Sequence, residues 1–365
     1  MIGLIGAPKT DLDTPALVLD LDRMQRNVAR MTGVFQQAGI GWRPHTKAIK
    51  TPALAHLLLR AGAFGVTCAK LGEAEVMAAA GIRDILIANQ IVGAAKISRL
   101  VNLLPLADVI VAVDNPDNVR HLDRAACAKG LPLRVVVEVD IGMHRAGTAP
   151  GEPTVELARM VAACPGLRLA GLMGWEGQTV KIAARDEKQR AIEQAVGQLV
   201  ATAEACRAAG LPVEIVSCGG TGTYQFTAFL PGITEVQAGG GIFCDVYYHD
   251  SMHVEHEYAL SILTTVTSRP TPTRIICDAG KKTMSSDAAL PRPLLPEGAE
   301  VESVSLSAEH ARIELSAPLD LPVGAHVEWL VGYSDTTTVL HDELIAVRND
   351  HVEAVWPILG RGKLR

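Results

Sequence analysis

Two alternating patterns of apolar residues run through the first two thirds of the chain. Short runs rich in β-branched residues end in polar residues, and each run is followed by a stretch with helical spacing. Buried strands separated by helices are typical of a parallel sheet with right-handed crossovers. The runs that indicate strands are Gly41–His45, Gly65–Cys68, Ile85–Ala88, Val109–Val113, Arg134–Val139, Leu169–Trp175, Val213–Ser217 and Glu235–Ala238. Eight such strands predict a closed (β/α)8 barrel, and an open doubly wound sheet is the alternative.

Helices are indicated between these strands. Four apolar residues spaced +4, +3 and +4 share one face of the first helix: Met24, Val28, Met31 and Phe35. Gly39 is typical of the end of that helix. Thr51-Pro52 and Asn115-Pro116 each combine an N-cap residue with proline at the first helical position. A long Ala-rich helix is expected over Ala183–Ala209.

The pattern changes near residue 255. From there, strand-like runs follow one another through turns that contain proline or glycine, without a convincing helix. These runs are Ala259–Arg269, Arg274–Asp278, Val301–Leu306, Ala311–Leu315, His326–Val331, Glu343–Val347 and Val352–Trp356. We therefore expect a β/α barrel at 21–254 and an all-β domain at 255–365. The segment 1–20 is expected to pair with the β domain through Ala16–Asp20.

Composition excludes several classes of protein. The 365 residues suffice for two packed domains, and the net charge of −6 comes from acidic and basic residues mixed along the chain. No basic face or charge run predicts binding to nucleic acid or to an anionic membrane. No stretch approaches the roughly 18 apolar residues of a membrane span, and the first residues lack the form of a secretory signal.

The seven cysteines are widely spaced and form no C-x-x-C pair. This spacing argues against a disulfide framework and against a structural zinc site. We therefore expect a reducing, cytoplasmic setting in which most thiols are small apolar core residues.

Candidate catalytic residues lie at the predicted strand ends, where β/α barrels place their active sites. Lys47 ends the first barrel strand in the motif RPHTK, and an amine in apolar surroundings is suited to covalent catalysis. A surface lysine is the ordinary alternative. The loops 217–223 (SCGGTGT) and 235–241 (EVQAGGG) follow the seventh and eighth strands, a recurring arrangement for binding phosphate through backbone N–H groups.

Two further strand ends offer contacts to a planar ring. Arg145 in EVDIGMHRAG is a candidate to hydrogen-bond a cofactor oxygen or ring nitrogen, with a salt bridge to Asp140 as the alternative. Trp175 in GWEGQ is a candidate to flank the ring, although an aromatic residue also closes many barrel ends.

Several motifs together resemble the D-threonine aldolase / D-serine dehydratase family. They are PHTKAIK, EVDIGMHRAG, SCGGTG, TEVQAGG, DAGKK, AEH and the tail LHDELIAVRNDHVEAVWPILGRGK, in the same order from about Asp13 to the C-terminus. The resemblance implies a fold-type III pyridoxal-phosphate enzyme with an alanine-racemase-like barrel, a β domain and a homodimeric assembly. It implies a Schiff base at Lys47 and pyridoxal contacts from Arg145 and Trp175, where the family more often has Tyr. The implied phosphate-binding residues are Gly220, Thr221, Gly239 and Gly240.

The segment that would hold the family's divalent metal departs from the pattern. In GYSDTTTVLHD, Tyr333 replaces the expected histidine while Asp335 is kept. A phenol with one carboxylate is a poor zinc site and at best a weak site for Mn or Mg. The connector YYHDSMHVEHEY offers His249, His253 and His256, and the first two would share a face if the connector were helical. Solvated histidines are the more common outcome in such a connector.

Three reactions fit this scaffold. Cleavage of a D-3-hydroxy amino acid gives glycine and an aldehyde, dehydration gives a 2-oxo acid and ammonia, and racemisation needs a second base for which no compelling candidate exists. We expect the aldolase first and the dehydratase second. The predicted catalytic residues are Lys47, Tyr333, Asp335 and His249. Asp335 is the candidate metal ligand, and a metal at the connector histidines is the less favoured alternative.

Two readings from other classes are weaker. A non-catalytic pyridoxal-phosphate carrier would lack the β domain. A metal-dependent barrel hydrolase would need carboxylate–His pairs at the strand ends, and these are missing.

Overall fold

The computed structural model describes residues 2–365, which form two compact units. The barrel unit comprises Ala29–Gly239 with Gly362–Arg365, and the β unit comprises the chain up to Val28 with Gly240–Arg361. The barrel is therefore inserted in sequence between two parts of the β unit. The domain boundaries expected at residues 20 and 254 stay a prediction.

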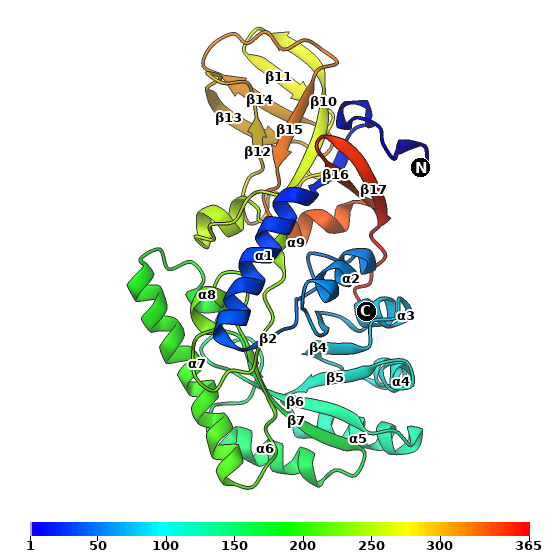
Figure 1. Ribbon diagram of the computed structural model, residues 1–365, viewed down its shortest axis with the longest axis vertical. Helices are drawn as coiled ribbons and strands as arrows, with labels where there is room; N and C mark the ends of the chain where they lie inside the picture. Colours follow the sequence, from blue (N-terminus) through cyan, green and yellow to red (C-terminus); the bar gives the residue numbers. More distant parts are fainter. Residues whose placement is uncertain (1) are drawn as a thin grey trace. The chain divides into compact units, whose positions relative to one another are not determined.

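The eight strands of the barrel unit pair in parallel throughout, in the order β2-β9-β8-β7-β6-β5-β4-β3. Figure 1 shows β4, β5, β6 and β7 side by side in this order. Their bounds are β2 Gly41–Trp42, β3 Val66–Cys68, β4 Asp84–Gln90, β5 Asp108–Val113, β6 Leu133–Val139, β7 Leu167–Gly174, β8 Ile215–Cys218 and β9 Glu235–Val236. A parallel bridge between His45 and Thr67 joins β3 to the segment after β2. The two ends of the sheet are thus joined, which confirms the predicted β/α barrel rather than the alternative of an open sheet.

Helices alternate with these strands. They are α1 Leu21–Ala38, α2 Pro52–Arg60, α3 Leu71–Ala79, α4 Ala94–Leu103, α5 Pro116–Lys129, α6 Glu152–Ala163, α7 Arg185–Ala208 and the short α8 Tyr224–Thr227. All four residues of the apolar face predicted for α1 are buried. The Asn115 side chain accepts hydrogen bonds from the N–H groups of Asp117 and Asn118, so it caps α5 as expected. Thr51 precedes Pro52 at the start of α2, but its hydroxyl makes no capping bond.

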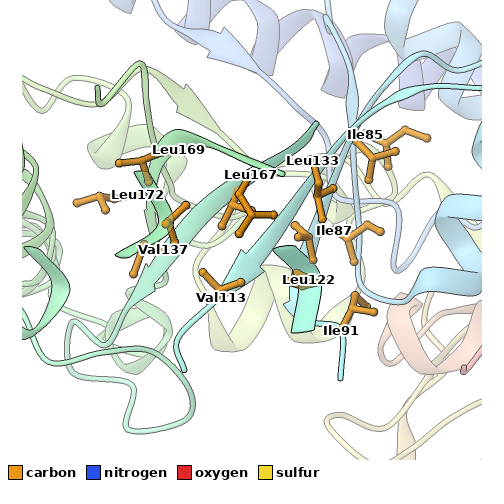
Figure 2. Close-up of a cluster of buried hydrophobic side chains, with 14 of the residues drawn as sticks. Ile85, Ile87, Ile91, Val113, Leu122, Leu133, Val137, Leu167, Leu169 and Leu172 are labelled. Carbon is orange, nitrogen blue, oxygen red and sulfur yellow. The ribbon is translucent and has the colours of Figure 1, made fainter. Parts of the chain in front are cut away.

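Side chains on barrel strands β4 to β8 alternate between two cores. Ile85, Ile87 and Val113 belong to a large cluster that also contains helix residues such as Leu122, so this cluster lies between strands and helices (Figure 2). The intervening residues of the same strands form a second, smaller cluster inside the barrel: Leu86, Ile110, Ala112, Val136, Ala170, Met173 and Ile215. Burial on both faces explains why these strands are continuous apolar runs rather than alternating ones.

The β unit is built on antiparallel strands. They are β1 Ala16–Asp20, β10 Leu260–Thr271, β11 Arg274–Cys277, β12 Arg292–Leu294, β13 Val301–Leu306, β14 Ala311–Leu315, β15 His326–Leu330, β16 Glu343–Arg348 and β17 His351–Pro357. The main path runs β13-β14-β11-β10-β1-β16-β17, and β15 pairs with β10 and β12. β1 lies antiparallel to β10 and parallel to β16. Elements that the sequence did not predict include β12 and the short helix α9 Ser334–Thr337, with the 3-10 turn Thr338–Leu340 after it.

Two further properties concern membrane association and the cysteines. Across residues 2–365, no helix has both the length and the apolar character that crossing a bilayer requires. All seven cysteines are free thiols.

Candidate active site

Lys47 lies in a short turn, Thr46–Lys50, at the carboxyl end of the first barrel strand. The Thr46 N–H donates to the Thr67 carbonyl at 2.7 Å, and the Thr46 hydroxyl donates to the same oxygen at 3.0 Å. The Lys50 N–H donates to the Thr46 carbonyl at 2.8 Å and closes the turn. Lys47 is the one residue of this turn that is not buried. The turn therefore offers a single accessible amine at the end of the barrel where active sites form.

A buried carboxylate organises the glycine-rich loop after β8. Glu176 is fully buried and accepts hydrogen bonds from the hydroxyls of Thr223 and Thr227, each at 2.7 Å, and from the Gly219 N–H at 3.2 Å. Thr223 in turn accepts a hydrogen bond from the Gly220 N–H at 3.1 Å. The Gly219 N–H is therefore bonded to Glu176, which follows β7, and the Gly220 N–H is bonded within the glycine-rich loop.

Two other N–H groups of the glycine-rich loops have no such partner. Gly222 and Gly239 are both buried, and neither N–H donates a hydrogen bond to any residue from 2 to 365. Buried backbone donors almost always have an acceptor, so these two groups fit an anion such as a phosphate. They follow β8 and β9, which are neighbouring strands.

Packing also requires glycine at the positions predicted to bind phosphate. A Cβ at Gly220 would lie 2.5 Å from the Trp175 ring, and one at Gly240 would lie 2.5 Å from the Tyr248 hydroxyl. A Cβ at Gly239 would overlap the backbone carbonyl of His45. Bulky substitutions at these positions therefore disturb packing as well as any anion site.

Arg145 pairs with Glu138 rather than with Asp140. Its guanidinium lies 3.7 Å from the Glu138 carboxylate, which also accepts a hydrogen bond from the Gln90 side chain at 2.5 Å. Burial raises the pKa of Glu138, while the Gln90 hydrogen bond and the Arg145 charge act in the opposite direction. Asp140 instead accepts N–H groups of its own loop. Glu138 thus holds a half-exposed guanidinium that is suited to contact a polar atom of a ligand.

Within the β unit, Tyr333 and Asp335 lie together as predicted, and a second phenol joins them. Tyr333 donates its hydroxyl hydrogen to Asp335 Oδ2 at 2.8 Å, and Tyr248 donates to Oδ1 at 3.4 Å. Burial, followed by the charge of Asp335, raises the pKa of both phenols. The phenols are therefore hydrogen-bond donors. The Asp335 carboxylate accepts both hydrogen bonds and is the group in this phenol–carboxylate cluster that can accept a proton.

A fourth residue fixes the backbone of this group. The carboxylate of Asp245 accepts the N–H of Tyr248 at 2.8 Å and the N–H of Ser334 at 2.7 Å. Burial raises the pKa of Asp245 to about 7, although both backbone hydrogen bonds favour the charged form. Asp245, Tyr248 and Glu176 were not recognised in the sequence, because an isolated acid or tyrosine carries no signal until its tertiary partners are known.

The three histidines of the connector have separate surroundings. Tyr247–Ser251 forms a π-helical turn, and His253 lies beyond it with a φ of +57°, so His249 and His253 do not share a helical face. His249 pairs with Asp250 at 2.8 Å and lies against the Tyr258 ring. The His256 ring nitrogen Nδ1 lies 2.7 Å from the Gly241 carbonyl.

The donor groups do not fit the divalent metal that the family resemblance implies. A search of residues 2–365 finds no group of three or more His, Cys, Asp or Glu side chains arranged to hold a metal ion. At the expected position, the phenol of Tyr333 stays protonated and donates a hydrogen bond to Asp335, the one conventional ligand there. A protonated phenol is a poor substitute for the imidazole lone pair that such metals prefer.

Comparisons with known proteins support the reading from the sequence. A family profile described as the N-terminal domain of alanine racemase matches residues 19–246, and a serine dehydratase domain profile matches residues 259–347. The 3-hydroxy-D-aspartate aldolase of Paracoccus denitrificans (strain Pd 1222) is 35% identical, over 99% of this chain and 95% of its own.

Solved structures agree over nearly the whole length. The D-threonine aldolase of Filomicrobium marinum has a TM-score of 0.94 and 35% identity over 99% of both chains. The D-threo-3-hydroxyaspartate dehydratase of Delftia sp. HT23 has a TM-score of 0.85 and 30% identity over 96% of this chain and 99% of its own. The chain therefore belongs to the D-threonine aldolase / D-serine dehydratase family of pyridoxal-phosphate-dependent lyases, which have an alanine-racemase-like barrel and a β-rich C-terminal domain.

Proposed function

We propose that this protein is a pyridoxal-phosphate-dependent aldolase that cleaves D-3-hydroxy amino acids, such as D-threonine, to glycine and an aldehyde. Relatives named as aldolases align over almost the whole chain. The observation that carries the proposal within this scaffold is the phenol–carboxylate group, because it provides a proton acceptor at a place where the metal donor set does not fit.

Except for Gly240, the cofactor-binding residues of this proposal belong to the barrel unit. The Lys47 amine would hold the cofactor aldehyde covalently, and the loops with Gly220, Thr221, Gly239 and Gly240 would bind its phosphate. The buried N–H groups of Gly222 and Gly239 support the phosphate assignment. Arg145 would hydrogen-bond a polar atom of the pyridoxal, and Trp175 would pack against its ring. When bound, the protonated pyridine ring would supply an electron sink that stabilises the electron pair left at Cα of the substrate.

Asp335 is the proposed base. It takes the proton of the substrate β-hydroxyl, the Cα–Cβ bond breaks, and the β-carbon leaves as the carbonyl carbon of an aldehyde. The electron pair stays on Cα, which takes up a proton and becomes glycine. The two phenols that donate to Asp335 orient its carboxylate and share its charge. His249, paired with Asp250, is the second proposed proton acceptor.

Dehydration of the same substrates is the second candidate. The relative from Delftia is named as a dehydratase. That reaction removes the Cα proton and expels hydroxide, a departure that a metal ion commonly assists as a Lewis acid. The donor set of Tyr333 and Asp335 is poorly suited to hold such an ion, so we place dehydration second.

Product analysis distinguishes the reactions. The purified protein, with pyridoxal phosphate, is incubated with D-threonine and D-serine, and glycine with aldehyde is assayed against 2-oxo acid with ammonia. We expect glycine and acetaldehyde from D-threonine, and Asp335→Asn should lower kcat by about 10²- to 10⁴-fold. Oxo acid without glycine would establish a dehydratase. Inversion at Cα without either product would indicate a racemase, and a lack of turnover of both substrates would favour a cofactor carrier.

We also propose a homodimer in a reducing, cytoplasmic compartment. The family resemblance supports the dimer, and seven unpaired cysteines support the compartment. Light scattering coupled to size-exclusion chromatography tests the oligomeric state.

A further inference from the structure

We propose that Lys50, through its buried ion pair with Glu73, is a positioning residue that holds the Lys47 amine in place for its bond to the cofactor. This inference rests on the proposed function, since it takes Lys47 as the cofactor-binding lysine. It assigns a role to a second lysine of the same motif, which the reaction itself does not use.

The ion pair is almost completely removed from solvent. The Lys50 side chain is 7% exposed and that of Glu73 is 1% exposed, and the Lys50 amine contacts Glu73 Oε1 directly. A buried ammonium and a buried carboxylate are costly to desolvate, so such a pair is weak evidence for stability alone. A role in fixing one geometry is the alternative explanation for keeping it.

The backbone at Lys50 gives independent support. Lys50 has a φ of +49°, in the left-handed region that favours glycine over any residue with a Cβ. Glycine would satisfy this turn better than lysine as far as the backbone is concerned. Lysine at this position therefore has a conformational cost, and the ion pair with Glu73 is what lysine provides there and glycine would not.

Glu73 connects this ammonium to the strand next to the turn. Its second oxygen accepts the N–H groups of Ala69 at 2.8 Å and Lys70 at 3.1 Å, where β3 ends and α3 begins. At the other end of the turn, Thr46 is hydrogen-bonded to Thr67 of β3. Both ends of the turn are thus fastened to the same strand–helix junction, and Lys47 projects from between them.

The pair also determines which lysine of the motif can react. The Lys50 amine is engaged by a carboxylate and buried, whereas Lys47, three residues earlier, is partly exposed. Amines act as nucleophiles in their neutral form, so an ammonium held by a buried carboxylate is a poor competitor for an aldehyde. The arrangement therefore favours attachment at Lys47 and disfavours attachment at Lys50.

The test uses a double variant, because Lys50→Met alone would leave the Glu73 carboxylate buried without its cation. In Lys50→Met/Glu73→Gln, the glutamine oxygen still accepts the N–H groups of Ala69 and Lys70. Lys50→Arg keeps the charge and is the conservative rescue. Arg43→Met/Glu235→Gln is the control, because it removes the buried pair of Arg43 with Glu235, at the start of β9, and also the pair of Arg43 with Asp84. It therefore perturbs the barrel unit at least as strongly as the double variant does.

Full-length protein is mixed with pyridoxal phosphate, and the rate of cofactor attachment is followed by absorbance. Borohydride trapping and peptide mapping then give the labelled fraction at residue 47. We expect the double variant to unfold at a temperature close to that of the control but to attach cofactor at least tenfold more slowly, with Lys50→Arg restoring most of the rate.

Two outcomes would overturn the proposal while leaving Lys47 as the cofactor lysine. One is attachment at the wild-type rate in the double variant. The other is an equal loss in the Arg43→Met/Glu235→Gln control, which would mean that any buried pair has this effect. Labelling of another lysine in the wild-type protein would instead refute the assignment of Lys47, and with it the proposed function of the turn.

Discussion

Thr223 connects the proposed phosphate-binding loop to the carboxylate of Glu176, so Thr223→Val tests how that loop is held. The substitution keeps the shape of the side chain but removes the donor to Glu176 and the acceptor of the Gly220 N–H. Loss of the hydrogen bond to the Glu176 carboxyl group costs up to roughly 3 kcal/mol, and an unsatisfied Gly220 N–H adds about 1–3 kcal/mol. If half of the second cost, about 0.5–1.5 kcal/mol, reflects a shifted loop, the Kd for pyridoxal phosphate should rise about twofold to thirteenfold.

Thr227→Val is the matched control. Thr227 is equally buried and donates to the same oxygen of Glu176 at the same distance of 2.7 Å, but it accepts nothing from the glycine-rich loop. Urea unfolding of both apo variants, with cofactor titration by absorbance, should show lost stability in both and weakened cofactor binding only in Thr223→Val. Equal changes in stability and in cofactor affinity would refute the idea that Thr223 positions the Gly220 amide.

Three further predictions follow from the described contacts. Lys47→Ala should abolish the visible absorbance of bound cofactor, whereas loss of that band in Lys70→Ala and its survival in Lys47→Ala would contradict the assignment. Chelator treatment should leave most of the activity of the wild type, and complete loss of activity that metal restores would show that a metal site exists. Tyr333→His should create activity that responds to added metal, because the new histidine and Asp335 could bind it together. Burial raises the pKa of Asp245 from 3.8 to about 7, so the folded protein binds a proton in that range that the unfolded chain does not. The free energy of unfolding should therefore decrease as the pH rises from 4 to 7, more steeply in the wild type than in Asp245→Asn, and equal slopes would exclude Asp245 as the source.

The sequence was sufficient for the barrel because its signals are local. β-branched runs, proline after an N-cap and glycine after a helix each act over a few residues, and all eight strands formed where those signals indicated. The missed elements are those whose local signal is weak. β12 contains Pro293 and is only three residues long, and α9 is a single turn whose start depends on Asp245 accepting the Ser334 N–H.

The site was predictable only as far as motifs go. Lys47, Arg145 and the glycine-rich loops were placed at strand ends by the barrel pattern. Lys50 in the turn after β2 pairs with Glu73 of helix α3, and Arg145 in the loop after β6 pairs with Glu138 of β6. No motif or spacing in the sequence indicates either pair. The glycines carried an ambiguous signal, since Gly220 and Gly239 are required by neighbouring Trp175 and His45 whether or not an anion binds.

The place of β1 in its sheet has a consequence for biosynthesis. Ala16–Asp20 is made early, yet its two neighbours β10 and β16 follow the entire barrel in the sequence. During translation, both edges of this strand stay unpaired while the barrel emerges from the ribosome. The side chains left exposed in that period are buried in the folded protein: Leu17, Val18 and Leu19. A nascent chain of this design exposes an aggregation-prone strand for most of its synthesis, and ribosome-associated chaperones that cover such a segment would raise the yield of folded protein.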